Sequence, residues 1–226
     1  VDEEIKPIYN VEQWERVQTL KEEFSRTEFK DARSTYYTLD NIKSIFMDRA
    51  SIKLANIDAL YSLTIPNDYF NKQDPGYIGN FLCIADGPGG FVQYIQYRWP
   101  NAQGMGMTLE GENSFDIKKL NMFKFDIHVG PDQTGNLFTN WTYMIDHAIG
   151  KNIMLCTADG GFDIQDNFRS QEALNSRLFF FQAAIGLSTC AKGGRFVLKA
   201  FDTVTQISAE AIFLRCMRVS SVSIFK

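Results

Sequence analysis

The fold of this chain is decided at residues 81–91, which read FLCIADGPGGF. The apolar residues predict a buried strand, the glycines after them predict a tight turn, and Phe91 opens a helix-like stretch. Glycine lets backbone amides approach a ligand closely, and Pro88 stiffens the turn. This order is typical of the ligand-binding edge of a doubly wound sheet, although a purely structural turn remains an alternative for such a loop alone.

On both sides of this turn, short apolar runs alternate with helix-like stretches. The expected strands are residues 81–85, 104–109, 153–158, 194–200 and 219–225. The expected helices between them are residues 91–99, 137–149, 171–191 and 207–218. The alternation predicts an α/β fold with right-handed crossovers and a mostly parallel sheet covered by helices on both faces.

The first seventy residues have a different, helical texture. Apolar residues at helical spacing predict helices over residues 11–29 and 42–63, the second capped by Asp40 and closed by Pro66. A Gln-Asp-Pro-Gly turn at residues 73–76 marks a boundary. We therefore expect an N-terminal helical extension, residues 1–70, packed on a core of residues 71–226. That core stops directly after a strand-like run, so we expect it to lack its last strand.

Composition narrows the class of protein. The chain has 226 residues, 45% of them hydrophobic and 22% charged, with a formal net charge of −4. These values exclude a disordered chain, and no apolar stretch reaches the roughly 18 residues of a membrane span. The first residues are acidic and do not resemble a signal peptide. The acidic balance means that a nucleic-acid partner would need a local basic cleft.

Cysteine usage indicates a reduced compartment. Cys83, Cys156, Cys190 and Cys216 are widely scattered, and none forms the paired spacing of a structural zinc site. Cysteines inside buried strands are more typical of an intracellular protein than of a disulfide scaffold.

Three charged residues stand where chemistry is expected. Asp159, in the ADGG stretch at residues 158–161, follows a buried strand; its alternative role is to cap the turn. Lys199 lies inside the apolar run FVLKAF at residues 196–201, where lysine is rare unless it has a partner or extends to solvent from an edge strand. Lys53 by itself would be an ordinary exposed helix lysine.

Taken together, five ordered stretches resemble the FtsJ-like (RrmJ-like) S-adenosylmethionine-dependent RNA 2′-O-methyltransferases. The closer resemblance is to the cap-specific mRNA (nucleoside-2′-O-)-methyltransferases, and it runs from about Ala32 to the end of the chain. The stretches that carry it are residues 49–58, 84–91, 104–111, 158–161 and 193–202.

The resemblance implies a Rossmann-like methyltransferase fold and a Lys-Asp-Lys-Glu catalytic tetrad. Lys53, Asp159 and Lys199 match its first three members. The fourth, a glutamate, is expected beyond Lys226. We expect Lys199 to act as the general base or to orient the ribose hydroxyl, with Lys53 and Asp159 tuning it. The transfer requires no metal.

The same resemblance implies a cofactor site for S-adenosyl-L-methionine and a substrate site for RNA. Cofactor contacts are expected from one stretch and one separate residue: Asp86, Gly87, Pro88, Gly89, Gly90 and Phe91, with Asn136 near the adenine in place of the family's acidic residue. Contacts to RNA or to the cap are expected from Arg33 and Arg49.

The leading hypothesis is methyl transfer to the ribose 2′-oxygen of the first transcribed nucleotide of capped mRNA. The alternatives are an rRNA or tRNA 2′-O-methyltransferase, a non-catalytic subunit that binds cofactor or RNA, and a small-molecule methyltransferase. The expected partner is capped RNA, with other capping or transcription proteins as further candidates and no membrane. The expected location is intracellular: the nucleus or, for a viral protein, the host nucleus or cytoplasm.

Overall fold

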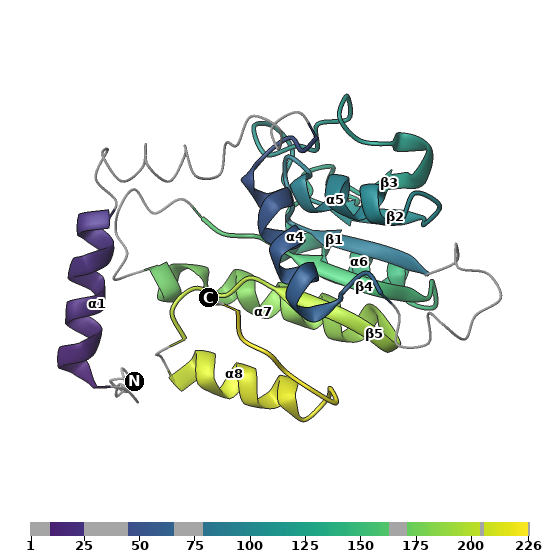
Figure 1. The fold of residues 1–226 in the computed structure, drawn as a ribbon. Coiled ribbons are helices and arrows are strands. Elements are labelled where there is room, and N and C mark those ends of the chain that lie inside the picture. The colour runs from purple at the N-terminus through teal and green to yellow at the C-terminus, as the bar shows by residue number, and fades with distance from the viewer. Residues whose placement is uncertain (1–9, 25–44, 66–78, 163–170, 204–205, 226) are drawn as a thin grey trace. The chain divides into compact units, whose positions relative to one another are not determined.

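The computed structural model describes residues 10–24, 45–65, 79–162, 171–203 and 206–225 (Figure 1). The chain forms two compact units. The sheet unit comprises Leu39–Gly160 and Phe181–Lys199, and the helical unit comprises Val1–Thr38, Gly161–Phe180 and Ala200–Lys226. The expected boundary near residue 70 lies in a part of the chain outside the described residues, so a division there stays a prediction.

A five-stranded parallel sheet forms the centre of the sheet unit. Its order is β3-β2-β1-β4-β5, and every neighbouring pair is parallel. The strands are β1 (Asn80–Ile84), β2 (Gly104–Met107), β3 (Phe125–Ile127), β4 (Ile153–Ala158) and β5 (Cys190–Leu198). The strand order reverses direction between β1 and β4, so their carboxyl ends form the topological switch point of the sheet. The predicted α/β fold is confirmed.

Helices cover both faces of this sheet. The helices of the unit are α4 (Arg49–Tyr61), α5 (Gly90–Arg98), α6 (Leu137–Ala148) and the second half of α7 (Gln171–Thr189). Figure 1 shows α4 and α5 on one face and α6 behind the strands. On the α7 side, a Cβ on Gly186 would overlap the ring of Phe196 in β5, so helix and strand lie unusually close there.

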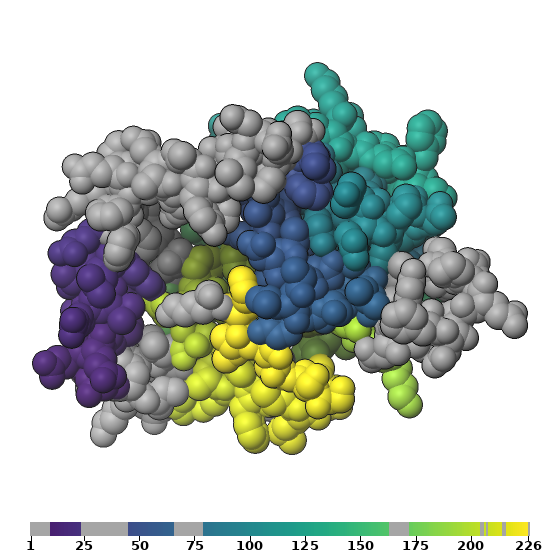
Figure 2. All heavy atoms as spheres, in the orientation of Figure 1, coloured from purple at the N-terminus to yellow at the C-terminus, as the bar shows by residue number. Residues whose placement is uncertain are grey.

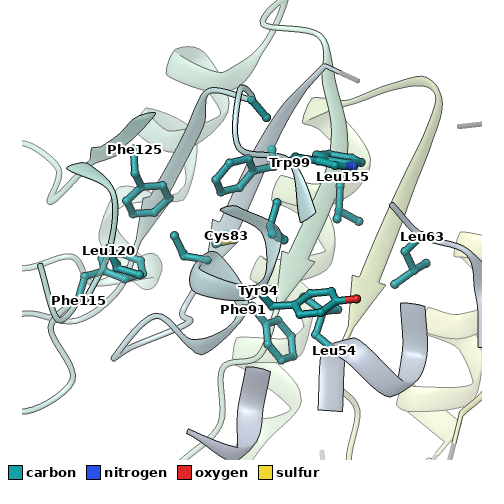
Figure 3. Packing of buried hydrophobic residues seen from close by; sticks show 14 residues of the cluster. Leu54, Leu63, Cys83, Phe91, Tyr94, Trp99, Phe115, Leu120, Phe125 and Leu155 are labelled. Atoms are coloured by element: carbon teal, nitrogen blue, oxygen red, sulfur yellow. The ribbon is translucent and has the colours of Figure 1, made fainter. Parts of the chain in front are cut away.

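Alternation along the strands directs side chains into a buried core (Figure 3). Phe81 and Cys83 of β1 and Leu155 of β4 point to the α4–α5 face, where they pack with Leu54 and Phe91. Each of these five side chains is at most 3% exposed. This shared core fixes α4 and α5 on the sheet and so positions the turns at its carboxyl edge.

The helical unit contains α1 (Val11–Phe24), the first half of α7 and α8 (Gln206–Cys216). Lys21 of α1 lies 2.5 Å from Asp202, which also accepts a hydrogen bond of 3.0 Å from Gln18. This contact between residues far apart in sequence ties α1 to the segment that follows β5. No helix in the described ranges is both long and apolar enough to cross a membrane.

The structure differs from the predicted elements most clearly at three places. The helix expected from residue 42 begins at Arg49, because the Asp48 side chain accepts the amide of Ser51 and caps the first turn; the expected cap, Asp40, lies outside the described residues. Residues 219–225 form no strand and are exposed, since no neighbouring strand pairs with them in the described part of the chain. The three-residue strand β3 was missed.

Candidate active site

Several of the site residues predicted from sequence lie at the carboxyl edge of the parallel sheet. β1 runs into the glycine-rich turn at residues 85–90, β4 into Asp159, and β5 into Lys199. Because all these strands run in the same direction, their carboxyl ends meet at one edge. The sheet, rather than any local sequence signal, therefore brings these segments together.

Lys199 and Asp159 form an ion pair at this edge. The Lys199 Nζ atom lies 3.1 Å from Oδ1 of Asp159 and also donates a hydrogen bond to the main-chain oxygen of Asp159. The Lys199 amide donates to the Ala158 carbonyl at 2.8 Å, which continues the β4–β5 pairing as far as Asp159 and Lys199. Their side chains are 31% and 16% exposed, so solvent and a substrate can reach them. Lys199, which directly follows β5, is thus paired, as a lysine within an apolar run of sequence requires.

Lys53 makes no direct contact of this kind with Lys199 or Asp159 in the described part of the chain. It is exposed on α4, a helix that forms part of the molecular surface in Figure 2. Within the part of the chain that the structure describes, no hydrogen bond or ion pair joins Lys53 to Asp159 or Lys199. Arg49 is exposed one helical turn earlier, on the same side of α4. Arg33 lies outside the described residues.

The start of α4 is coupled to the glycine-rich turn. Ser51 Oγ donates a hydrogen bond of 2.9 Å to the carbonyl of Gly90, and both residues are buried. The Asp48 carboxylate lies against Gly90 so closely that a Cβ at that position would overlap it. Sequence reasoning missed Asp48, although an aspartate directly before an apolar-periodic run is a recognisable capping signal.

Asp86 holds the turn in place from inside. Its carboxylate accepts hydrogen bonds from the amides of Phe91 at 3.2 Å and Val92 at 2.9 Å, and so caps the N-terminus of α5. The residue is 3% exposed, and burial raises the pKa of its carboxyl well above the ordinary value, with the Asp159 charge adding to the rise. The structure therefore gives Asp86 a capping function; a direct cofactor contact stays a prediction.

The turn leaves backbone donors available at the start of α5. Gly89 has a φ of +113°, a conformation that glycine adopts readily. No described residue accepts a hydrogen bond from the amide of Gly89 or of Gly90. The amide of Gly87, in contrast, donates to Thr108 Oγ1 at 3.2 Å. Free amides at a helix N-terminus favour a negatively charged ligand group.

The turns after β2 and β3 pack on the same edge. Thr108 Oγ1, besides accepting from Gly87, donates to the Asn113 carbonyl at 3.2 Å. Gly135, at a φ of +65°, lies against the Thr108 backbone with no room for a side chain. Asn136 caps α6 by accepting the Phe138 amide at 3.0 Å, and its predicted contact with adenine remains untested. Thr108 links the two turns, a function that its sequence position alone does not reveal.

Comparisons with known proteins identify the family of this chain. The family model of the FtsJ-like methyltransferases matches residues 46–226. The chain belongs to that family. Methyltransferases of the family use S-adenosylmethionine as methyl donor, and the unbonded amides of Gly89 and Gly90 fit the carboxylate of its methionine part.

Several relatives of this family member are named cap-specific mRNA (nucleoside-2′-O-)-methyltransferase 1. The chain is 31% identical to the Drosophila melanogaster protein over 224 residues, 92% of this chain and 28% of that protein. It is 30% identical to the Danio rerio protein over 232 residues and to the human protein over 220 residues. These alignments cover 93% and 88% of this chain, and 28% and 26% of the two relatives. The chain therefore spans little more than a quarter of the relatives' length.

Among solved structures, the chain is similar to a protein described as a ribosomal RNA methyltransferase from Plasmodium falciparum. The sequences are 19% identical, and the match covers 75% of this chain and 85% of that chain with a TM-score of 0.47.

Proposed function

We propose that this FtsJ-like chain transfers a methyl group to the ribose 2′-oxygen of the first transcribed nucleotide of capped mRNA, which forms cap 1. The observation that carries the proposal is the Lys199–Asp159 ion pair beside the glycine-rich turn. The support for the capped substrate comes from the relatives named cap-specific 2′-O-methyltransferases, at about 30% identity over about 90% of this chain.

The proposed reaction needs help with one proton. A ribose 2′-hydroxyl is a poor nucleophile at neutral pH, so a nearby base or hydrogen-bond acceptor increases its reactivity. In the proposed step, Lys199 Nζ in its neutral form takes the hydroxyl proton while the ribose oxygen forms a bond to the methyl carbon. Bound S-adenosylmethionine would supply the methyl group and would leave as a neutral thioether, because the electron pair of its carbon–sulfur bond would stay on sulfur. Asp159 orients the lysine toward the hydroxyl.

S-adenosylmethionine, when bound, supplies a methyl group already activated on a sulfonium. Glycines 87, 89 and 90 would hold its methionine part through backbone groups, with Phe91 beneath them in the core. Asn136 would lie near the adenine. The protein's own task is then to align hydroxyl and methyl, since correct orientation is itself a large part of catalysis.

The RNA is proposed to approach over α4. Arg49 and Lys53 form an exposed basic pair on one side of this helix, where they can neutralise backbone phosphates. Arg33 is proposed to add a further contact. Other capping or transcription proteins as partners, and an intracellular, nuclear or host-cell location, remain proposals.

Methyl transfer to matched RNAs tests the proposed function. Labelled S-adenosylmethionine would be supplied with one RNA that carries an N7-methylguanosine cap and with the same RNA that carries a 5′-triphosphate. The expected result is cap-dependent labelling of the first ribose, abolished by Lys199→Ala. Equal labelling of both RNAs would favour an rRNA or tRNA substrate. Cofactor binding without transfer would favour a non-catalytic subunit.

A further inference from the structure

Gln182 is a polar side chain within the apolar second half of α7. It is 1% exposed, and its Oε1 atom accepts a hydrogen bond of 2.8 Å from the amide of Gly160. A buried amide side chain is rarely retained unless it satisfies a particular backbone group. Here that group belongs to the turn that carries Asp159.

The bonded amide is part of the Asp159–Gly160 peptide unit. The N–H of this unit, on Gly160, donates to Gln182, and its C=O, on Asp159, accepts from Lys199 Nζ. A peptide unit is planar, so its N–H and C=O turn together. When Gln182 holds the Gly160 N–H, it therefore also fixes the direction of the Asp159 C=O. Each of the two hydrogen bonds polarises the peptide unit, which strengthens the other.

Packing around the Asp159–Gly160 peptide unit is close, and the Asp159 amide also donates to the Ile84 carbonyl at 3.3 Å. A Cβ on Gly160 would lie 2.8 Å from both Ala85 Cβ and Gln182 Oε1, so there is no room for a side chain at this position. Gln182 and Ala85 thus enclose the peptide unit from two sides. Both lie in the sheet unit, as do Asp159 and Lys199.

We propose that Gln182 is a positioning residue for methyl transfer, which sets the location of the Lys199 ammonium or amine through the Asp159–Gly160 peptide. The inference rests on the proposed function, because it assigns Gln182 an effect on the reacting lysine. Gln182 itself touches neither the methyl group nor the ribose. Its loss allows the peptide to rotate and deprives Lys199 of the carbonyl acceptor.

A matched set of variants tests this inference. Gln182→Met removes the acceptor at similar length, and Gln182→Glu keeps a carboxyl oxygen for the Gly160 amide. Gln96→Met is the control: Gln96 lies on α5 and exchanges two hydrogen bonds of 2.9 Å with the backbone of Asn121, so its loss costs comparable contacts away from the Asp159 turn.

The first measurement needs no activity. Selectively labelled lysine is followed by NMR at a single pH, with the Lys199 signal assigned by its absence in Lys199→Arg. A hydrogen bond changes the chemical shift of the donating group, so loss of the bond from Lys199 Nζ to the Asp159 carbonyl should move the Lys199 signal. In Gln182→Met we expect the Lys199 signal to leave its wild-type position. In Gln182→Glu, which keeps an acceptor for the Gly160 amide, and in Gln96→Met the signal should stay near the wild-type position.

The second measurement is steady-state methyl transfer. Gln182→Met should lower kcat by about 10- to 100-fold, with the KM for S-adenosylmethionine changed less than about threefold, as for a displaced catalytic group. Gln182→Glu should recover most of kcat. A Gln182→Met protein that melts earlier but keeps the wild-type Lys199 signal would overturn the inference, because Gln182 would then be structural only. A Lys199 signal that moves in Gln182→Met, combined with no methyl transfer by the wild-type protein, would overturn the proposed function and leave the positioning contact supported.

Discussion

Lys199 contacts Asp159 twice, once through the carboxylate at 3.1 Å and once through the main-chain oxygen of the same residue. The two residues are 40 positions apart, yet each directly follows one of two adjacent parallel strands. Their separation is consequently fixed by the hydrogen-bond register between β4 and β5, and loop geometry contributes little. An ion pair placed in this way needs no large rearrangement to form.

Replacement of Lys199 should separate catalysis from stability. Lys199→Ala should lower the rate of methyl transfer by at least about 100-fold, the usual contribution of a positioned acid or base. The free energy of unfolding should change by less than about 1 kcal/mol, because partly exposed ion pairs contribute little. Initial rates and chemical denaturation of the same preparations provide both numbers.

Lys119→Ala is a suitable comparison for that experiment. Lys119 forms an exposed ion pair of 3.3 Å with Asp116, so its removal deletes a pair of the same type away from the Asp159 turn. Its transfer rate should match the wild type. A Lys199→Ala protein as active as Lys119→Ala would contradict the assigned chemistry.

The buried Asp86 should make stability depend on pH. Burial raises the pKa of Asp86 above its ordinary value of 3.8, although the two amide hydrogen bonds oppose part of the rise. Between the ordinary and the raised pKa, the folded state binds more protons than the unfolded state. The free energy of unfolding therefore falls as pH increases through this window.

Asp86→Asn removes this proton uptake, so the free energy of unfolding of the variant should depend less on pH. Urea denaturation from about pH 4 to pH 8 measures the difference between wild type and variant. That difference should move in favour of Asp86→Asn as pH increases. A difference that is constant with pH would show that Asp86 has the same pKa in the folded and unfolded states, which would contradict the rise caused by burial.

Asp58 should be the most sensitive polar position of the sheet unit. It is 6% exposed and accepts hydrogen bonds from the Thr64 amide at 2.7 Å, the Thr64 hydroxyl at 2.6 Å and the Tyr94 hydroxyl at 2.7 Å, with Arg98 at 3.4 Å. Burial and the Asp58 contact together raise the pKa of Tyr94. Asp58→Ala leaves several buried donors without an acceptor and should cost about 3 kcal/mol in the free energy of unfolding. Asp126→Ala, at an exposed position of β3, should cost less than about 0.5 kcal/mol in the same denaturation experiment.

Alkylation should rank the four cysteines by exposure. Cys216 is exposed, whereas Cys83 and Cys156 are fully buried, and burial raises the pKa of both of these thiols. Burial also raises the pKa of Cys190 to about 11, which leaves little reactive thiolate at neutral pH. Peptide mass spectrometry after brief iodoacetamide treatment should find Cys216 modified first. Equal labelling of Cys83 in the folded protein would contradict the observed core.

Strong local signals were sufficient for most of the fold. Residues 153–158 were predicted as a strand and form β4 without change. The start of α6 was also predicted correctly, because Asn136 gives a clear cap, and the helix ends one residue before its predicted end. The start of α4 was misplaced because the apolar spacing continues through Ile45, whereas the Asp48 cap determines where the helix begins. A side-chain cap satisfies backbone amides that would otherwise lack an acceptor, so it determines the first residue of the helix even where the apolar spacing extends further toward the N-terminus.

The site was predictable only as separate pieces. Asp159 was predicted after an apolar strand and Lys199 inside one, whereas in the structure each follows its strand and their contact follows from strand pairing. Gln182 could not be assigned from sequence, since its bond to Gly160 spans 22 positions and no local pattern encodes it. The position of Lys53 relative to the pair likewise depends on how α4 packs, which spacing alone does not determine.

Gly186 sets the distance between α7 and the sheet, and this distance affects the hydrogen bond between Gln182 and Gly160. Gly186 follows Gln182 by one helical turn on the same side of α7, and the ring of Phe196 occupies the space where its side chain would be. A methyl group at this position, as in Gly186→Ala, would increase the distance between α7 and β5 and move the Gln182 amide away from Gly160. The absence of a side chain at Gly186 therefore sets the distance between α7 and β5, and this distance places the Gln182 amide within hydrogen-bond reach of Gly160.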